Sequence, residues 1–180
     1  RTMKLDLMQI HNVGFRDRLE TAAQLAWLRE CKASGVCRYI GVTHSQDQQS
    51  ANDRLIDLMQ REKLDFMQVN YSMAERSVEE RLLAVAVATG TAVLINLPFA
   101  RAQLFAAVRG KPLPEWAAEF DATSWGQFFL KYLLANEAVT CVIPGSDKSE
   151  YMADNLNAGR GRLPDAAMRR KMVDYISALS

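Results

Sequence analysis

Side chains able to donate or accept hydrogen bonds follow each of five short apolar segments of this chain. His11 comes directly after the first segment, and both histidines of the sequence belong to the set. Packing alone does not require this recurrence, which therefore indicates a site that binds and orients a ligand. Gly145 and Ser146 lie between a strand-like and a helical segment, where free amide groups and the helix dipole favour an anion. The set is His11, Asn12, Thr43, His44, Ser45, Gln68, Asn70, Tyr71, Asn96, Gly145, Ser146, Asp147 and Lys148.

Each of these residues also has a purely structural interpretation. His11 could be a hydrogen-bonded histidine of the core. The run Thr43–Ser45 could cap the helix that follows it, and Gln68 and Asn70 could form a turn. The residues alone leave these alternatives open.

The elements that would position the set alternate regularly along the chain. Short apolar runs, typical of strands buried on both faces, predict strands at Leu5–Ile10, Tyr39–Val42, Phe66–Val69, Ala92–Leu97 and Thr140–Ile143. Helical spacing and capping residues predict helices over Leu19–Ser34, Asn52–Arg61, Ser77–Gly90 and Ser124–Asn136, and after Gly145 and Asp165. In the first helix the apolar residues at helical spacing are Leu19, Ala22, Ala23, Ala26, Trp27 and Cys31.

Strand and helix alternate five times, which predicts parallel strands with right-handed crossovers. An open doubly wound sheet has the same rhythm, but no Gly-x-Gly-x-x-Gly turn follows any strand. Polar strand ends favour a barrel, which needs eight units and about 250 residues. The chain has 180 residues and begins with Arg1. We therefore expect an α/β fold of (β/α)8 TIM-barrel type, incomplete here with about five units, as one domain over residues 1–180.

The segment from Arg101 to Ala122 interrupts this alternation. It carries a short helical stretch and then a rigid turn around Pro112 and Pro114. Long loops of barrels often cover the active-site face, although a loop without a role is an equal alternative.

Composition excludes several classes of function. The net charge is +1, which gives no electrostatic basis for binding nucleic acid or an anionic membrane. The basic run Arg169–Lys171 is expected to be a solvated face, and no apolar run is long enough to span a membrane. The odd count of three cysteines predicts small buried side chains, with neither a disulfide framework nor a metal site. We expect a cytoplasmic protein, with periplasmic export as the alternative.

Four motifs in order resemble the aldo-keto reductases. They are Leu5–His11, Gly35–Thr43, Gln68–Ser72, and Val142–Gly145 followed by Asp154–Leu156. The resemblance covers essentially the full chain and implies strands four to eight of the barrel, in a bacterial subgroup. It implies a carbonyl reductase that uses NADPH, or NADH as the alternative.

The resemblance also implies roles for individual residues. In the family a tyrosine acts as general acid, helped by a lysine, an aspartate and a histidine. His11 matches that histidine, and a neutral imidazole there can donate a hydrogen bond that orients the substrate carbonyl. The other three belong to the first three units, so they are expected to be missing here. The matching cofactor-binding positions are Thr43, His44 and Gln68 for the nicotinamide amide, Gly145, Ser146, Asp147 and Lys148 for the adenosine phosphate, and Asp154 and Asn155 for the adenine.

The chain departs from the family at three positions. Asn96 replaces the aromatic residue that commonly stacks on the nicotinamide, and His44 replaces an asparagine. Tyr151 stands where many members place an arginine against the 2′-phosphate, and Lys148 could substitute for it. The leading hypothesis is an NAD(P)H-dependent reductase of aldehydes or ketones, inactive as this chain alone. The alternatives are a non-catalytic nicotinamide-nucleotide-binding module or a vestigial truncated barrel.

Overall fold

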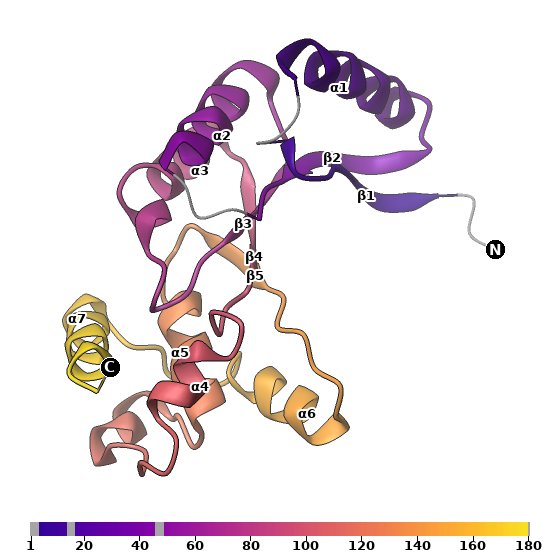
Figure 1. Ribbon diagram of the computed structural model, residues 1–180. Coiled ribbons are helices and arrows are strands. Elements are labelled where there is room, and N and C mark those ends of the chain that lie inside the picture. Colours follow the sequence, from indigo (N-terminus) through magenta and orange to yellow (C-terminus); the bar gives the residue numbers. More distant parts are fainter. Residues whose placement is uncertain (1–3, 14–16, 46–48, 180) are drawn as a thin grey trace. The chain divides into compact units, whose positions relative to one another are not determined.

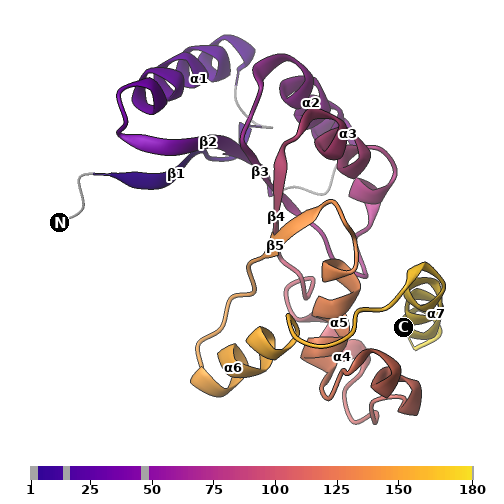
Figure 2. The same ribbon diagram turned by 180° about the vertical axis from the view of Figure 1, so that it is seen from behind.

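The computed structural model describes residues 4–13, 17–45 and 49–179. Their internal contacts define two compact units, one of Arg1–Asn70 with Ser77–Leu94 and the other of Tyr71–Arg76 with Ile95–Ser180. Figures 1 and 2 show the elements of both units from opposite sides. The strands form one five-stranded sheet in the order β1-β2-β3-β4-β5, which is the order of the sequence. Strand, helix and strand therefore follow one another as the alternation predicts.

The first unit is a sheet with its helices on one side. Strands β1 (Leu5–Ile10), β2 (Cys37–Thr43) and β3 (Phe66–Asn70) pair in parallel, with Ile10 beside Val42 and Thr43 beside Gln68. Helices α1 (Arg18–Ala33) and α2 (Gln49–Glu62) cover the same side of these strands (Figures 1 and 2). A 3₁₀ helix (Ser77–Glu79), α3 (Leu82–Thr89) and most of β4 (Ala92–Asn96) complete the unit.

Helix α1 buries a different face from the one that its apolar spacing indicates. The buried side chains are Thr21, Leu25, Leu28 and Cys31. Leu19 is 82% exposed and Trp27 is 54% exposed. The helix itself is confirmed, and Asp17 caps it by accepting hydrogen bonds from the amides of Leu19 and Glu20.

The helix expected from Ser77 is broken near its start. Ser77–Glu79 forms the 3₁₀ helix, and α3 begins only after Arg81, whose extended φ of −143° interrupts the helical backbone. Gly90 ends α3 in the left-handed conformation, at a φ of 70°, as its position predicts.

The second unit is mainly helical. It contains α4 (Gln103–Ala107), a 3₁₀ helix (Glu115–Phe120), α5 (Trp125–Leu134), β5 (Val139–Val142), α6 (Ser149–Asn157) and α7 (Ala166–Ser177). Helix α5 lies between α6 and α7 in both views (Figures 1 and 2). The residues from Gly126 to Leu133 are all buried. Ser124 caps α5 by accepting from the amide of Gln127, as predicted. Helix α5 is thus the core helix of this unit.

Two expectations about single residues are wrong. Cys141 is exposed, whereas Cys31 and Cys37 are buried and burial raises the pKa of the Cys37 thiol. Arg169 is not part of a solvated face, because its guanidinium donates to the Tyr71 hydroxyl at 2.8 Å and lies 4.5 Å from the centre of the Tyr132 ring. Of the helices described, none is long and apolar enough to cross a membrane.

Candidate functional site

The ends of β1 and β2 carry a hydrogen-bonded set of side chains that we call the histidine network, formed by His11, Asn12, Thr43 and Ser45. His11 Nδ1 lies 3.0 Å from Thr43 Oγ1, which also accepts from the Asn12 amide at 3.0 Å. The Asn12 side-chain amide lies 3.0 Å from His11 Nε2, and Ser45 Oγ donates to Asn12 Oδ1 at 3.0 Å. Asn12 adopts a left-handed φ of 55°, which brings its backbone amide and side chain back to the network.

These contacts fit one tautomer of the neutral imidazole. A side-chain amide that donates to Nε2 requires a neutral ring with its proton on Nδ1, and that proton is donated to Thr43 Oγ1. His11 is exposed, so the interpretation of a core histidine is wrong. A ligand carbonyl that takes a hydrogen bond from Nε2 must displace the Asn12 amide and requires the other tautomer.

His44 and Gln68 are the other two residues that are predicted, with Thr43, to contact the nicotinamide. The backbone amide of His44 donates to the carbonyl of Gln68 at 2.9 Å, which extends the pairing of β2 and β3 beyond Thr43. The His44 side chain is only 1% exposed, and Gln68 is half-buried. Their contact with a nicotinamide stays a prediction.

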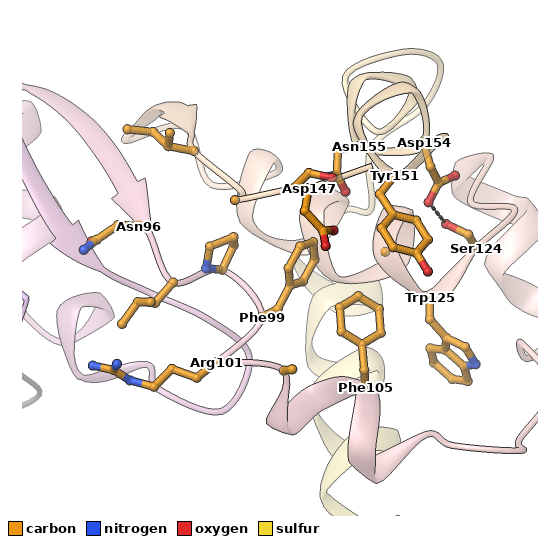
Figure 3. Close-up of a pocket in the computed structure, with 17 residues that line it drawn as sticks. Asn96, Phe99, Arg101, Phe105, Ser124, Trp125, Asp147, Tyr151, Asp154 and Asn155 are labelled. Atoms are coloured by element: carbon orange, nitrogen blue, oxygen red, sulfur yellow. Dashed lines mark hydrogen bonds between the residues drawn. The ribbon is translucent and has the colours of Figure 1, made fainter. Parts of the chain in front are cut away.

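The second unit contains a cavity of about 970 Å³, which we call the β4–β5 pocket because the segments after these two strands line it (Figure 3). Helices α4, α5 and α6 contribute the rest of its wall. The predicted residues that line the pocket are Asn96, Gly145, Ser146, Asp147, Asp154 and Asn155, whereas Lys148 is not among the lining residues. The structure therefore brings together six of the seven cofactor-binding candidates of this unit.

An aromatic wall of the pocket was not predicted. The rings of Phe99 and Phe105 lie 4.8 Å apart, and Trp125 stacks on Phe129 at 5.8 Å. Trp125 is fixed further by its indole N–H, which donates to the Lys111 carbonyl at 3.0 Å. Part of the segment Arg101–Ala122 thus lines a cavity, and a role for this segment stays a prediction.

Backbone strain is concentrated in the segment that follows β4. Leu97, Ala100, Arg101 and Ala102 have φ values of 51°, 48°, 53° and 70°, in the left-handed region that non-glycine residues rarely adopt. All but Ala100 line the pocket. Strand β4 ends at Asn96, one residue earlier than predicted, because Leu97 is the first of these left-handed residues.

Helix α6 is fixed to the start of α5 through Asp154. Its carboxylate accepts from Ser124 Oγ and from Gln127 Nε2, both at 2.6 Å, and Gln127 Oε1 accepts from Thr123 in turn. A Cβ at Gly126 would lie 3.0 Å from Asp154 Oδ2, so the glycine permits this close approach. Asp154 therefore serves as an anchor, and this role was not foreseen.

The Asn155 side chain, by contrast, is available to a ligand. Within the described ranges its amide has no hydrogen-bond partner, and it lines the pocket beside Asp147 and Tyr151 (Figure 3). Adjacent residues of one helix thus take two roles, anchoring and facing the cavity.

The loop after α6 is fixed by a buried lysine. Lys131 is fully buried on α5, and its ammonium donates to the carbonyls of Arg160 and Arg162 at 2.5 and 3.0 Å. Burial lowers the pKa of Lys131. Hydrogen bonds from the Arg162 guanidinium and backbone amide hold the pKa of Asp121 well below its usual range. The sequence analysis did not single out this lysine, although a lone charge within an apolar helix is a signal that it could be buried and paired.

Comparisons with known proteins identify the family. The model of the aldo/keto reductase family matches residues 1–171, so the chain belongs to this family. No curated protein matches the chain. Within the described residues, no group of three or more histidine, cysteine or acidic side chains could hold a metal ion.

Solved structures share the fold. An aldo-keto reductase from Bacillus halodurans in its holo form is 22% identical, with a TM-score of 0.73 over 97% of this chain and 62% of its own. An aldo-keto reductase from Klebsiella pneumoniae in complex with NADP and acetate is 18% identical, with a TM-score of 0.75 over 97% of this chain and 60% of its own. The glycerol dehydrogenase of Gluconobacter oxydans is 19% identical, with a TM-score of 0.72 over 98% and 59%. The chain thus spans about three fifths of the length of these structures.

These matches confirm the expected fold class. The five-stranded sheet with its alternating helices is the α/β fold of aldo-keto reductase barrels, present here with five strands. The doubly wound alternative is therefore wrong.

Proposed function

We propose that this chain is the cofactor-binding and carbonyl-orienting part of an NAD(P)H-dependent oxidoreductase that reduces aldehydes or ketones to alcohols. The observation that carries the proposal is the β4–β5 pocket, in which aromatic rings, an unpaired amide and a guanidinium line one cavity. Membership of the aldo/keto reductase family supports the reaction class.

The lining residues fit a dinucleotide. The cavity of about 970 Å³ lies at the upper end of the usual range for small-molecule sites. Asn155 offers both a donor and an acceptor, which suits the edge of an adenine. The Arg101 guanidinium suits a pyrophosphate. Buried Asn96 Oδ1 has no partner in the described part of the chain, so it can accept from a ligand donor.

The reaction requires a hydride at the carbonyl carbon and a proton at the carbonyl oxygen. A nicotinamide cofactor, when bound, would supply the hydride. His11 then orients the carbonyl through Nε2 once the Asn12 amide has moved aside, and Thr43 keeps the ring in place through Nδ1. Tyr71 is unsuited to give the proton because it is fully buried, and Tyr39 is unsuited because it lies in the first half of β2, away from the carboxyl end of that strand. We propose that a tyrosine in upstream barrel units gives it.

A non-catalytic dinucleotide-binding module is the second candidate. The observation that favours it is the histidine network, in which both nitrogens of His11 are engaged inside the protein. The intact mass of the native protein separates the two candidates, because three further barrel units would add roughly 100 residues.

The direct experiment uses the 180-residue chain. We expect it to bind NADPH or NADH by titration calorimetry but to show no steady reduction of benzaldehyde, because a missing proton donor alone costs about 10²–10⁴-fold in rate. Asn155→Ala should weaken binding, and Asn157→Ala, on the exposed end of the same helix, should not. Steady turnover by this chain would contradict the assignment of the proton donor, and absence of binding would contradict the cofactor site.

A further inference from the structure

The β4–β5 pocket has two chemically different ends. Arg101 extends away from the aromatic rings at one end, whereas Asp147, Tyr151, Asp154 and Asn155 gather at the other (Figure 3). A dinucleotide would place its pyrophosphate toward the guanidinium and its adenine toward the amide of Asn155. Its adenosine ribose would then lie at the end that carries the carboxylates.

The charges at this end are predominantly negative. Asp147 and Asp154 line the pocket, and Glu150 lies in the first turn of α6. The opposing charges are the Lys148 ammonium and the N-terminus of α6, which is equivalent to about half a positive charge. The ammonium lies over the Tyr151 ring, 5.1 Å from its centre, rather than in the pocket lining.

The two carboxylates of the pocket are not equivalent. Asp154 already accepts from Ser124 and Gln127. The carboxylate of Asp147 is exposed and accepts no hydrogen bond from any residue that the structure describes. It is therefore the group available to a ribose hydroxyl.

We infer that the pocket selects the 2′-hydroxyl of NADH against the 2′-phosphate of NADPH, with Asp147 as the specificity-determining residue. A ribose hydroxyl can donate to this carboxylate, as in sites where an acidic residue binds the ribose of NAD. A 2′-phosphate brings a charge near −2 and meets like charge instead. The inference rests on the proposed function, since it assigns the form of the dinucleotide that the same pocket binds.

The test compares two dissociation constants. A doubly charged phosphate about 5 Å from one carboxylate in water loses about tenfold in affinity, so we expect NADH to bind at least tenfold more tightly than NADPH. The ratio of the NADPH dissociation constant to that of NADH should fall as salt is raised, because salt screens the repulsion between the 2′-phosphate and the carboxylate. The pyrophosphate is common to both dinucleotides, so its own salt dependence cancels in this ratio. Asp147→Asn should bring the ratio close to one, and Tyr151→Arg should reverse it. The matched control is Glu137→Gln, an exposed carboxylate outside the pocket, which should leave the ratio unchanged.

Each result has one meaning. Tighter binding of NADH that depends on Asp147 and on salt supports the inference. Equal or tighter binding of NADPH overturns it and leaves the proposed function standing. Binding of neither dinucleotide overturns the proposed function and the inference with it.

Discussion

Gly41 is the position where a single methyl group should do the most damage to the first unit. It lies in β2 opposite Phe66 of β3, two residues before Thr43 of the histidine network. A Cβ built on Gly41 would lie 2.4 Å from the Phe66 carbonyl oxygen, and that atom belongs to the backbone and cannot rotate away. Gly41→Ala must therefore separate the two strands.

The cost follows from the size of that separation. Ordinary contact begins at 3.4 Å, so the strands must part by about 1.0 Å. The neighbouring bonds, from Asp65 N to Ile40 O at 3.1 Å and from His44 N to Gln68 O at 2.9 Å, would stretch to roughly 4 Å and be lost. The bond from Ile40 N to the Asp65 carboxylate at 2.9 Å would be weakened too. At about 1 kcal/mol each, against a gain of about 0.5–1 kcal/mol for replacing glycine, the net loss is about 2 kcal/mol.

The assay is urea unfolding of the chain, with hydrogen exchange measured on peptides from β2 and β3. Gly41→Ala should lower the free energy of unfolding by about 2 kcal/mol and speed exchange in both strands. The control is Gly159→Ala, whose Cβ would meet the Leu156 carbonyl oxygen at 3.5 Å, an ordinary contact. An alanine at position 41 that leaves stability and exchange unchanged would refute the reasoning.

Three further predictions concern the second unit. Lys131→Met should lower the free energy of unfolding by about 2 kcal/mol, measured in urea, because the two lost hydrogen bonds from a charged donor outweigh the desolvation cost that the substitution removes. The control Arg170→Met, at an exposed position, should leave stability unchanged. Gln127→Leu leaves Asp154 with one donor fewer and should speed hydrogen exchange in α6; unchanged exchange would argue against the anchor. The low folded-state pKa of Asp121 contributes stability at neutral pH that is lost as the pH falls below about 4, its unfolded value, and Asp121→Asn should flatten this part of the stability profile.

The strands could be predicted from the sequence because each is a short apolar run. Predicted and observed bounds agree within two residues, and β1 agrees at both ends. The face of α1 could not be predicted in the same way. Leu25 and Leu28 are buried, and so is Thr21, whose hydroxyl accepts from Arg54 at 3.1 Å, whereas Leu19 and Trp27 are exposed. Spacing identifies a helix but does not say which of two apolar faces packs.

The site was predictable where a polar residue follows a strand or where a family motif marks a position. His11 and Asn96 lie at strand ends and Asp147 lies in the loop after β5, whereas Asp154 and Asn155 were found from the motif. Phe99 and Phe105 come from the part of the chain around the interruption of the alternation, and Trp125 begins the predicted helix Ser124–Asn136, so only the folded chain shows that their rings share one wall. The anchoring role of Asp154 was missed for the same reason, since its partners lie 27 and 30 residues away.

The left-handed residues after β4 imply an inverted pattern of tolerated substitutions. At most positions glycine is the costly replacement, but at Ala100 and Ala102 glycine would relieve the backbone and the present side chain carries the strain. In a library of variants selected for thermal stability alone, glycine should therefore accumulate at these two positions. A library selected for ligand binding should instead keep alanine at both positions, because a more flexible glycine loop loses more conformational entropy when a ligand binds. The residues accepted in the two libraries should thus differ first in this short segment, whereas those accepted in the sheet should be the same in both.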